Sequence, residues 1–123
     1  MKRIGLAGAL VMAVGLLSAG PALAGDAANG EKVYKKCKAC HALEEGKHKV
    51  GPSLAGIVGK PAGAAEGYKY SKAMAESSLV WDEATLDGYL EKPRSFLKGT
   101  KMSFAGLKKE EDRADVIEFL KQN

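Results

Sequence analysis

The segment Cys37-Lys38-Ala39-Cys40-His41 decides the fold of this chain. Two cysteines separated by two residues and followed directly by a histidine form the pattern that attaches c-type haem. Each thiol can add to one vinyl group, and the spacing places both sulfurs at the same edge of the porphyrin. His41 then lies under the ring, where its imidazole can bind the iron. We therefore expect one haem c, covalently attached through Cys37 and Cys40, with His41 as an axial ligand.

The same two cysteines are compatible with other chemistry in principle. A thioredoxin-type dithiol would follow a β-strand, and no strand is predicted before Cys37. A zinc site needs four ligands, and His48 is the only other cysteine or histidine beyond the attachment segment. A local disulfide between Cys37 and Cys40 remains the alternative to haem attachment.

A second axial ligand has to come from the opposite face of the haem. The candidates are His48, Met74 and Met102. His48 follows His41 closely and stands between two lysines, which indicates a solvated surface residue. Met74 lies in a short amphipathic stretch and can be a core residue, whereas Met102 lies in a segment without helical periodicity. We favour Met102, whose thioether would raise the iron potential, and Met74 remains the alternative.

The first 24 residues have the pattern of a secretory signal peptide. Lys2 and Arg3 precede an uncharged apolar run, and Ala22-Leu23-Ala24 matches the small-residue cleavage pattern. The run, residues 4–19, is shorter than the ~20 residues that a membrane-spanning helix needs. We predict cleavage after Ala24, export to the periplasm, and no stable membrane insertion. Residues 25–123 then form a single small domain.

Length and composition exclude several classes of protein. With 123 residues the chain is too short for a multidomain enzyme, and its two cysteines are too few for a disulfide scaffold. The formal charge is +4, whereas a nucleic-acid binder usually concentrates much more positive charge. We expect a monomeric domain that does not bind nucleic acid.

Hydrophobic periodicity predicts an all-α domain. The expected helices cover residues 27–38, 71–77, 83–92, and 108 or 109 to 121. Asp26 and Asp82 can cap the first and third of these helices, and Pro93 ends the third. Residues 42–70 are expected to form an irregular loop along one side of the cofactor, and no segment shows convincing strand alternation.

The order of motifs along residues 25–123 resembles the class I (c2-type) bacterial cytochromes c and is similar to mitochondrial cytochrome c. One such motif is weak evidence, whereas the complete ordered set is strong. The motifs are Gly30-x-x-x-Tyr34, Cys37 to His41, Gly51-Pro52-x-Leu54-x-Gly56, Gly67-Tyr68-x-Tyr70-Ser71, Trp81, Tyr89-Leu90-x-x-Pro93, Gly99-Thr100-Lys101-Met102-x-Phe104-x-Gly106, and residues 113–120. The resemblance implies a small class I cytochrome c fold, with three to five helices around one covalent haem.

The resemblance implies roles for residues beside His41 and beside a haem propionate. The carbonyl of Pro52 would accept the Nδ1–H of His41 and orient the ligand. Tyr70 and Trp81 would donate to a haem propionate, which needs partners once it leaves water. Lys60 stands where an arginine often lies near a propionate, which makes that contact less secure.

The resemblance also implies roles near Met102, at the haem edge and where the first and last helices cross. Tyr89 and Thr100 would lie near Met102 and tune the iron, although Tyr89 can equally be a core residue. Phe104 would cover the haem edge. Lys98 stands where a proline often precedes the Gly-Thr-Lys-Met sequence, so this loop is expected to be less rigid. Gly30 and Tyr34 would cross the last helix near Phe119, although Tyr34 and Phe119 at helical spacing are more often plain core residues.

These features predict a soluble one-electron carrier in the periplasm. Two fixed ligands leave no open iron position for a substrate, so we expect no enzymatic activity. A lysine-rich haem edge would attract acidic partners such as a bc1-type complex, a terminal oxidase or a photosynthetic reaction centre. We call this group the basic rim, which comprises Lys35, Lys36, Lys38, Lys98, Lys101, Lys108 and Lys109. The alternatives are a peroxidase-like haem enzyme and a gas-binding sensor with a labile Met ligand, both of which need an iron site that opens.

Overall fold

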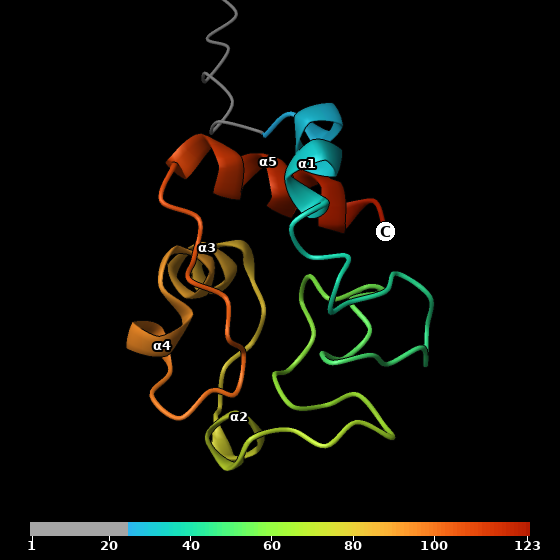
Figure 1. Cartoon of the computed structure of the whole chain (residues 1–123), viewed down its shortest axis with the longest axis vertical. Helices are drawn as coiled ribbons and strands as arrows, with labels where there is room; N and C mark the ends of the chain where they lie inside the picture. Colours follow the sequence, from blue (N-terminus) through green and yellow to red (C-terminus); the bar gives the residue numbers. More distant parts are fainter. Residues whose placement is uncertain (1–24) are drawn as a thin grey trace, which may run out of the picture.

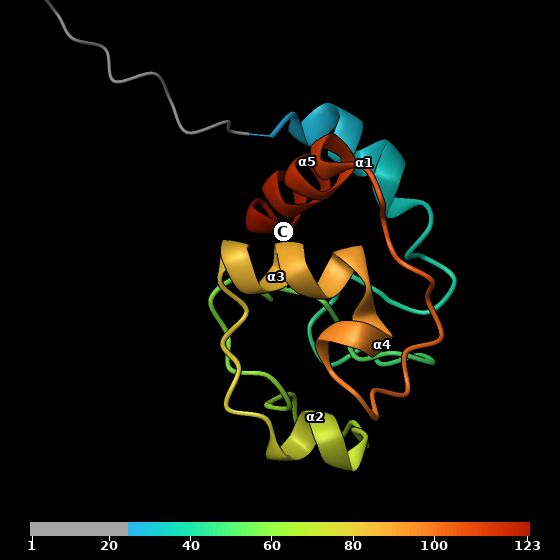
Figure 2. The ribbon, with the colours of Figure 1, turned by 90° about the vertical axis from the view of Figure 1, so that its left-hand side faces the viewer.

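The computed structural model describes residues 25–123 and contains five helices in that range. They are α1 (Ala27–Tyr34), α2 (Lys72–Glu76), α3 (Glu83–Glu91), α4 (Pro93–Phe96) and α5 (Glu110–Lys121). Helices α1 and α5 cross at one end of the molecule, α3 lies beneath α5, and α2 lies at the other end (Figures 1 and 2). Between residues 25 and 123 extended chain pairs only at an isolated bridge between Pro61 and Val80. The all-α prediction is confirmed, and the predicted signal peptide lies outside the described residues.

Helix α1 starts where the sequence predicted but ends earlier. Asp26 caps it by accepting backbone N–H groups of the first turn. The prediction of a helix as far as residue 38 is wrong. After Tyr34 the chain forms turns in which the N–H groups of residues 35–37 donate to the carbonyls three residues earlier, instead of four as in an α-helix. The N–H of Cys37, for example, donates to the Tyr34 carbonyl at 2.8 Å. These turns lead the chain from α1 into the attachment segment.

Pro93 ends one helix and begins the next. Helix α3, capped by Asp82, ends at Glu91, as expected two residues before a proline. The sequence predicted only the end of a helix at Pro93, whereas the structure shows the four-residue helix α4 beginning there. A proline suits a first helical position, because its φ is already fixed and its missing N–H has no partner to lose. Helix α4 turns the chain toward residues 97–109.

The other two helices lie close to their predicted ranges. Helix α2 is capped by the side chain of Ser71, which was predicted as its first residue. Helix α5 begins at Glu110, and Lys109 is its N-cap residue. Residues 42–70 contain no helix, as predicted. None of the helices between residues 25 and 123 is long and apolar enough to cross a bilayer.

Helices α1 and α5 approach at the backbone of Gly30. A Cβ atom at Gly30 would lie 2.0 Å from the carbonyl oxygen of Asp115. Beside this point the rings of Tyr34 and Phe119 pack with centroids 5.3 Å apart, so the predicted crossing near Phe119 is confirmed. The carboxylate of Asp115 also accepts the N–H of Asp26 at 2.7 Å. The crossing therefore joins the two ends of the domain both sterically and by hydrogen bonding.

We expect Gly30→Ala to lower the free energy of unfolding by about 2 kcal/mol, since overpacking typically costs more than the helix propensity that alanine gains. The colliding atom is a backbone carbonyl, which cannot rotate away. Chemical denaturation of the haem-loaded protein measures the change. Gly88→Ala is the matched control, because its Cβ would meet the ring of Phe96, which is 42% exposed and can move. Equal losses in the two variants would contradict this account.

Arg113 fixes the loop that leads into α5. Its side chain is buried, with Nε donating to Asp87 Oδ1 at 2.7 Å. Nη1 donates to the carbonyls of Leu107 and Lys108 at 2.8 and 3.0 Å. The hydrogen bond to Asp87 raises the pKa of Arg113, so the guanidinium stays charged despite its burial. Residues 107–108 are thereby held against α3 and α5.

Candidate functional site

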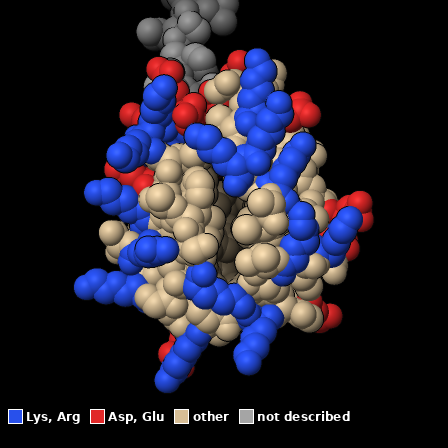
Figure 3. Space-filling view, viewed as in Figure 1, with Lys and Arg blue, Asp and Glu red and all other residues tan. Residues whose placement is uncertain are grey.

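A cavity of about 750 Å³ separates the two halves of the domain. The attachment segment and residues 41–70 line one side, and α3 with residues 100–104 line the other. Figure 3 shows its opening as a narrow crevice between two largely uncharged surfaces. Cofactor pockets of proteins commonly occupy roughly 300–1,000 Å³. The fold therefore encloses space for one cofactor of haem size.

The attachment segment forms part of the cavity wall. Cys37, Cys40 and His41 all line the cavity, and the two thiols are not joined to each other. The N–H groups of Cys40 and His41 both donate to the Cys37 carbonyl, at 3.1 and 2.9 Å, which folds the segment into one tight turn. Burial raises the pKa of Cys37, and Cys40 adds to this effect while Lys36 opposes it. Both thiols are placed to react with a group inside the cavity.

His41 is held in the tautomer that binds metals. Its Nδ1 lies 2.7 Å from the carbonyl oxygen of Pro52, as the family resemblance implied. A carbonyl only accepts, so Nδ1 carries the proton and the lone pair of Nε2 is free. Burial lowers the pKa of His41, the charge of Lys49 acts in the same direction, and the bond to Pro52 opposes both. A neutral, oriented imidazole fits the role of an iron ligand.

Gly51 keeps the His41 ring in place, a role that was not predicted from the sequence. A Cβ at Gly51 would lie 2.2 Å from Cε1 of His41, so any side chain there would displace the imidazole. The N–H of Gly51 donates to the Cys40 carbonyl at 2.7 Å. Gly51 directly precedes Pro52 in one of the quoted motifs, so the sequence did mark this position. Its contact with His41, ten residues earlier, is not visible in the sequence.

The opposite side of the cavity carries the predicted cluster around Met102. The hydroxyls of Tyr89 and Thr100 lie 2.7 Å apart, and the N–H of Met102 donates to Thr100 Oγ1 at 3.4 Å. Burial raises the pKa of Tyr89, although its bond with Thr100 opposes the shift, so the phenol stays neutral. Met74 also lines the cavity, at α2. The structure thus brings both candidate thioethers to the cavity, and the hydrogen bonds fix the segment of Met102.

The remaining predicted haem contacts also line the cavity. Tyr70, Trp81 and Phe104 all contribute to its surface. The Tyr70 oxygen accepts the N–H of Ala65 at 3.0 Å, which leaves its O–H able to donate elsewhere. Trp81 is 6% exposed. Lys60 lines the cavity too, and its Nζ donates to a loop carbonyl, that of Ala55, at 2.9 Å.

His48 is not the solvated residue that its lysine neighbours indicated. The ring is half-buried, with Nε2 lying 2.7 Å from the Glu66 carbonyl. Its Nδ1 accepts the N–H of Ser53 at 3.0 Å. The expectation was wrong because the main partner is 18 residues away in sequence and invisible to local composition. His48 joins two parts of the 42–70 loop.

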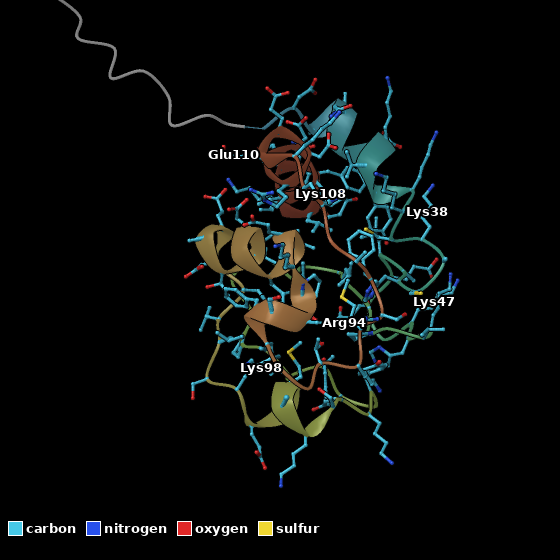
Figure 4. All side chains as sticks on the ribbon, turned by 60° about the vertical axis from the view of Figure 1, so that its left-hand side comes forward. Lys38, Lys47, Arg94, Lys98, Lys108 and Glu110 are labelled. Atoms are coloured by element: carbon cyan, nitrogen blue, oxygen red, sulfur yellow. The ribbon has the colours of Figure 1, made fainter. Side chains whose placement is uncertain are left out.

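Basic side chains surround the crevice, as Figure 3 shows, whereas acidic side chains lie mainly at the periphery of this face. In Figure 4, Lys38 and Lys47 come from the segment after α1, and Arg94 and Lys98 come from α4 and the chain after it. All seven residues of the basic rim are exposed. The positive charge is therefore contributed from both sides of the opening.

Five helices around a cavity, with both thiols and the metal-binding tautomer of His41 in its wall, define a protein built to hold haem covalently. The cytochrome c family model matches residues 27–123. A cytochrome c2 of Rhodomicrobium vannielii is 50% identical over 121 residues, which cover 98% of this chain and 95% of that protein. A cytochrome c of Chlamydomonas reinhardtii is 52% identical over 101 residues, or 80% of this chain and 90% of that one.

A solved structure, cytochrome cH from Methylobacterium extorquens, superposes with a TM-score of 0.78 at 46% identity and covers 80% of this chain and all of its own. The chain belongs to the cytochrome c family. Its cofactor is haem c, attached covalently through Cys37 and Cys40. It is accordingly an electron carrier and not an enzyme, which sets aside the peroxidase-like alternative.

Proposed function

We propose that the chain is a periplasmic carrier that moves single electrons between membrane-bound redox complexes, with His41 and Met102 as the axial ligands of its haem. The observation that carries this proposal is the cavity itself. One wall presents the free Nε2 of His41, the other presents Met102, and basic side chains surround the opening. Bound haem c supplies the one-electron couple.

The protein's own residues keep the two ligands fixed. The Pro52 carbonyl and Gly51 hold the imidazole of His41, and Thr100 holds the backbone of Met102. Buried apolar side chains, among them Leu86, Leu90 and Val116, line part of the cavity. Fixed ligands change little in geometry when the charge of the iron changes, which keeps electron transfer fast. In this proposal Tyr70 and Trp81 donate to a propionate, Tyr89 acts through Thr100, and Phe104 covers the haem edge.

Met102 is preferred to Met74 as the ligand because no helical periodicity accounts for its place in the cavity wall. Residues 97–109 contain no helix. They are nevertheless connected to α3 by a hydrogen bond from the N–H of Leu107 to the carbonyl of Leu90, at 2.7 Å. Met74 and Met102 both pack against the hydrophobic core. Met74 does so from helix α2, where helical periodicity accounts for a core-facing side chain without any iron ligation.

Docking to acidic partners is tested by the salt dependence of electron transfer. We expect the rate to a purified bc1-type complex or oxidase to fall with ionic strength, because exposed charges are screened beyond a distance of about 8–10 Å. At low salt Lys36→Gln, Lys98→Gln and Lys108→Gln should each slow transfer about two- to fivefold. Stopped-flow kinetics at several salt concentrations measure both effects.

Lys121→Gln is the matched control for these variants. It removes the same charge, but Lys121 on α5 already pairs with Glu83 and Glu118. We expect its transfer rate to stay close to that of the unmodified protein. Rates that ignore salt, or that fall equally in the control, would mean that the rim lysines are ordinary solvated residues.

The processing prediction is tested by intact mass. The protein purified from the periplasm should begin at Gly25 and carry one haem that acid–acetone does not extract. Gly25 already packs against α5, where an added Cβ would lie 2.1 Å from the Ala114 carbonyl. A mass that includes residues 1–24 would refute cleavage, and loss of haem to acid–acetone would refute the thioether links.

A further inference from the structure

Tyr68 joins the two sides of the cavity that carry the proposed iron ligands. Its hydroxyl donates to the Val50 carbonyl at 2.6 Å, across 18 residues of sequence. Val50 directly precedes Gly51 and Pro52, the residues that hold the His41 ring. Tyr68 is therefore tied to the backbone that orients one ligand.

The same side chain contacts the residue beside the other ligand. Lys101, which precedes Met102, places its Nζ 4.3 Å from the centroid of the Tyr68 ring, a cation–π contact. That ammonium also donates to the carbonyl of Lys69, which is 32 residues away in sequence. Lys101 thus binds both the ring of Tyr68 and the backbone beside it, and the segment of Met102 is fastened to residues 68–69.

The Tyr68 ring is fixed in this position by two further aromatic neighbours. Tyr70 packs edge-on against it with centroids 4.8 Å apart, and His48 lies at 5.6 Å. His48 is itself held at both ring nitrogens by Ser53 and Glu66. The ring therefore packs among Lys101, Tyr70 and His48 and bridges the two loops.

We propose that Tyr68 is a positioning residue, which acts through Lys101 and Val50 to hold the Met102 segment closed over the iron. This inference rests on the proposed function, in which Met102 is a ligand. Opening that segment breaks the contacts of Lys101 to residues 68–69, and Tyr68 couples those contacts to the backbone that holds His41. These contacts therefore determine the free energy needed to displace Met102 from the iron, independently of the stability of the whole fold.

The test is displacement of Met102 in the ferric holoprotein by imidazole, followed by loss of the Met–iron charge-transfer band. Tyr68→Phe removes the bond to Val50 and should raise the apparent imidazole affinity about two- to fivefold. Lys101→Met removes the ammonium and should raise it by a similar factor. In the double variant the imidazole affinity should rise by less than the product of the two single factors. Both changes interrupt the same connection, which runs from Lys101 through Tyr68 to Val50.

Lys49→Met is the matched control. Its ammonium donates to the Lys38 carbonyl at 2.6 Å, a lysine–backbone bond that stays on the His41 side. This variant should bind imidazole as the unmodified protein does. Denaturant unfolding of all four variants gives the global stability, which a merely structural role would lower without changing the imidazole affinity.

The proposal is overturned if Tyr68→Phe and Lys101→Met bind imidazole with unchanged affinity, if Lys49→Met shifts equally, or if the two effects multiply fully. A failure of the proposed Met102 ligation can be distinguished from a failure of this inference, because it is visible in the spectra before any imidazole is added. In that case the unmodified ferric protein has no Met–iron band, or keeps the band in a Met102→Ala variant.

Discussion

Replacement of His41 by alanine is expected to leave almost no folded haem protein. The change removes the proposed iron bond, the hydrogen bond to the Pro52 carbonyl and the ring that packs on Gly51. A small domain has only about 5–15 kcal/mol of stability, and a cavity of about 750 Å³ that loses its cofactor cannot be filled by collapse. Haem absorbance per unit of protein in periplasmic extracts measures the loss.

His48→Ala is the control that separates iron binding from histidine loss in general. It removes two hydrogen bonds within the 42–70 loop, so it should cost about 1–3 kcal/mol of stability and retain the haem. A His41→Ala protein that accumulates at the normal level with an unchanged spectrum would rule out His41 as the ligand.

Replacement of Met102 by alanine is expected to keep the covalent haem but lower the reduction potential, on the order of 0.2 V within the ~0.8 V range that axial ligation spans. A thioether favours ferrous over ferric iron, and alanine leaves a position that water or another ligand takes. The Met–iron charge-transfer band should disappear. A spectroelectrochemical titration records both the band and the potential.

Met74→Ala is the matched variant, since the same side chain is removed from the same cavity. It should retain the band and shift the potential little, while unfolding about 2–3 kcal/mol more easily through lost core packing. If Met74→Ala removes the band and Met102→Ala does not, the ligand assignment is reversed.

Local sequence predicted the parts of this molecule that depend on local physics. Residues 110–121 carry an apolar side at helical spacing with acidic residues in the first turn, and they form α5. The Cys37–His41 spacing predicted one wall of the cavity. Helix α4 was not predicted because a proline is compatible both with the end of a preceding helix and with the start of a following one, and Pro93 was assigned only the first role.

Contacts between distant residues were beyond this kind of prediction. His48 stands among lysines, yet its ring is held by Glu66, and Arg113 in an exposed-looking helix is buried against Asp87, 26 residues earlier. The resemblance placed Pro52, Tyr89 and Thr100, whose contacts the structure contains, but gave Tyr68 no role. Only the folded structure shows that Tyr68 lies between Lys101 and Val50.

The bond between Asp26 and Asp115 joins residues 89 positions apart, so the chain between α1 and α5 is one large closed ring. Closure entropy grows only with the logarithm of ring size, so ten residues inserted into such a ring cost about 0.1 kcal/mol. Insertions in residues 42–70 that avoid the cavity wall should therefore be tolerated easily. Shortening α1 or α5 by one turn instead opens the whole ring. Changes in chain length are therefore expected to be tolerated within residues 42–70 and to destabilise the fold at the contact between α1 and α5.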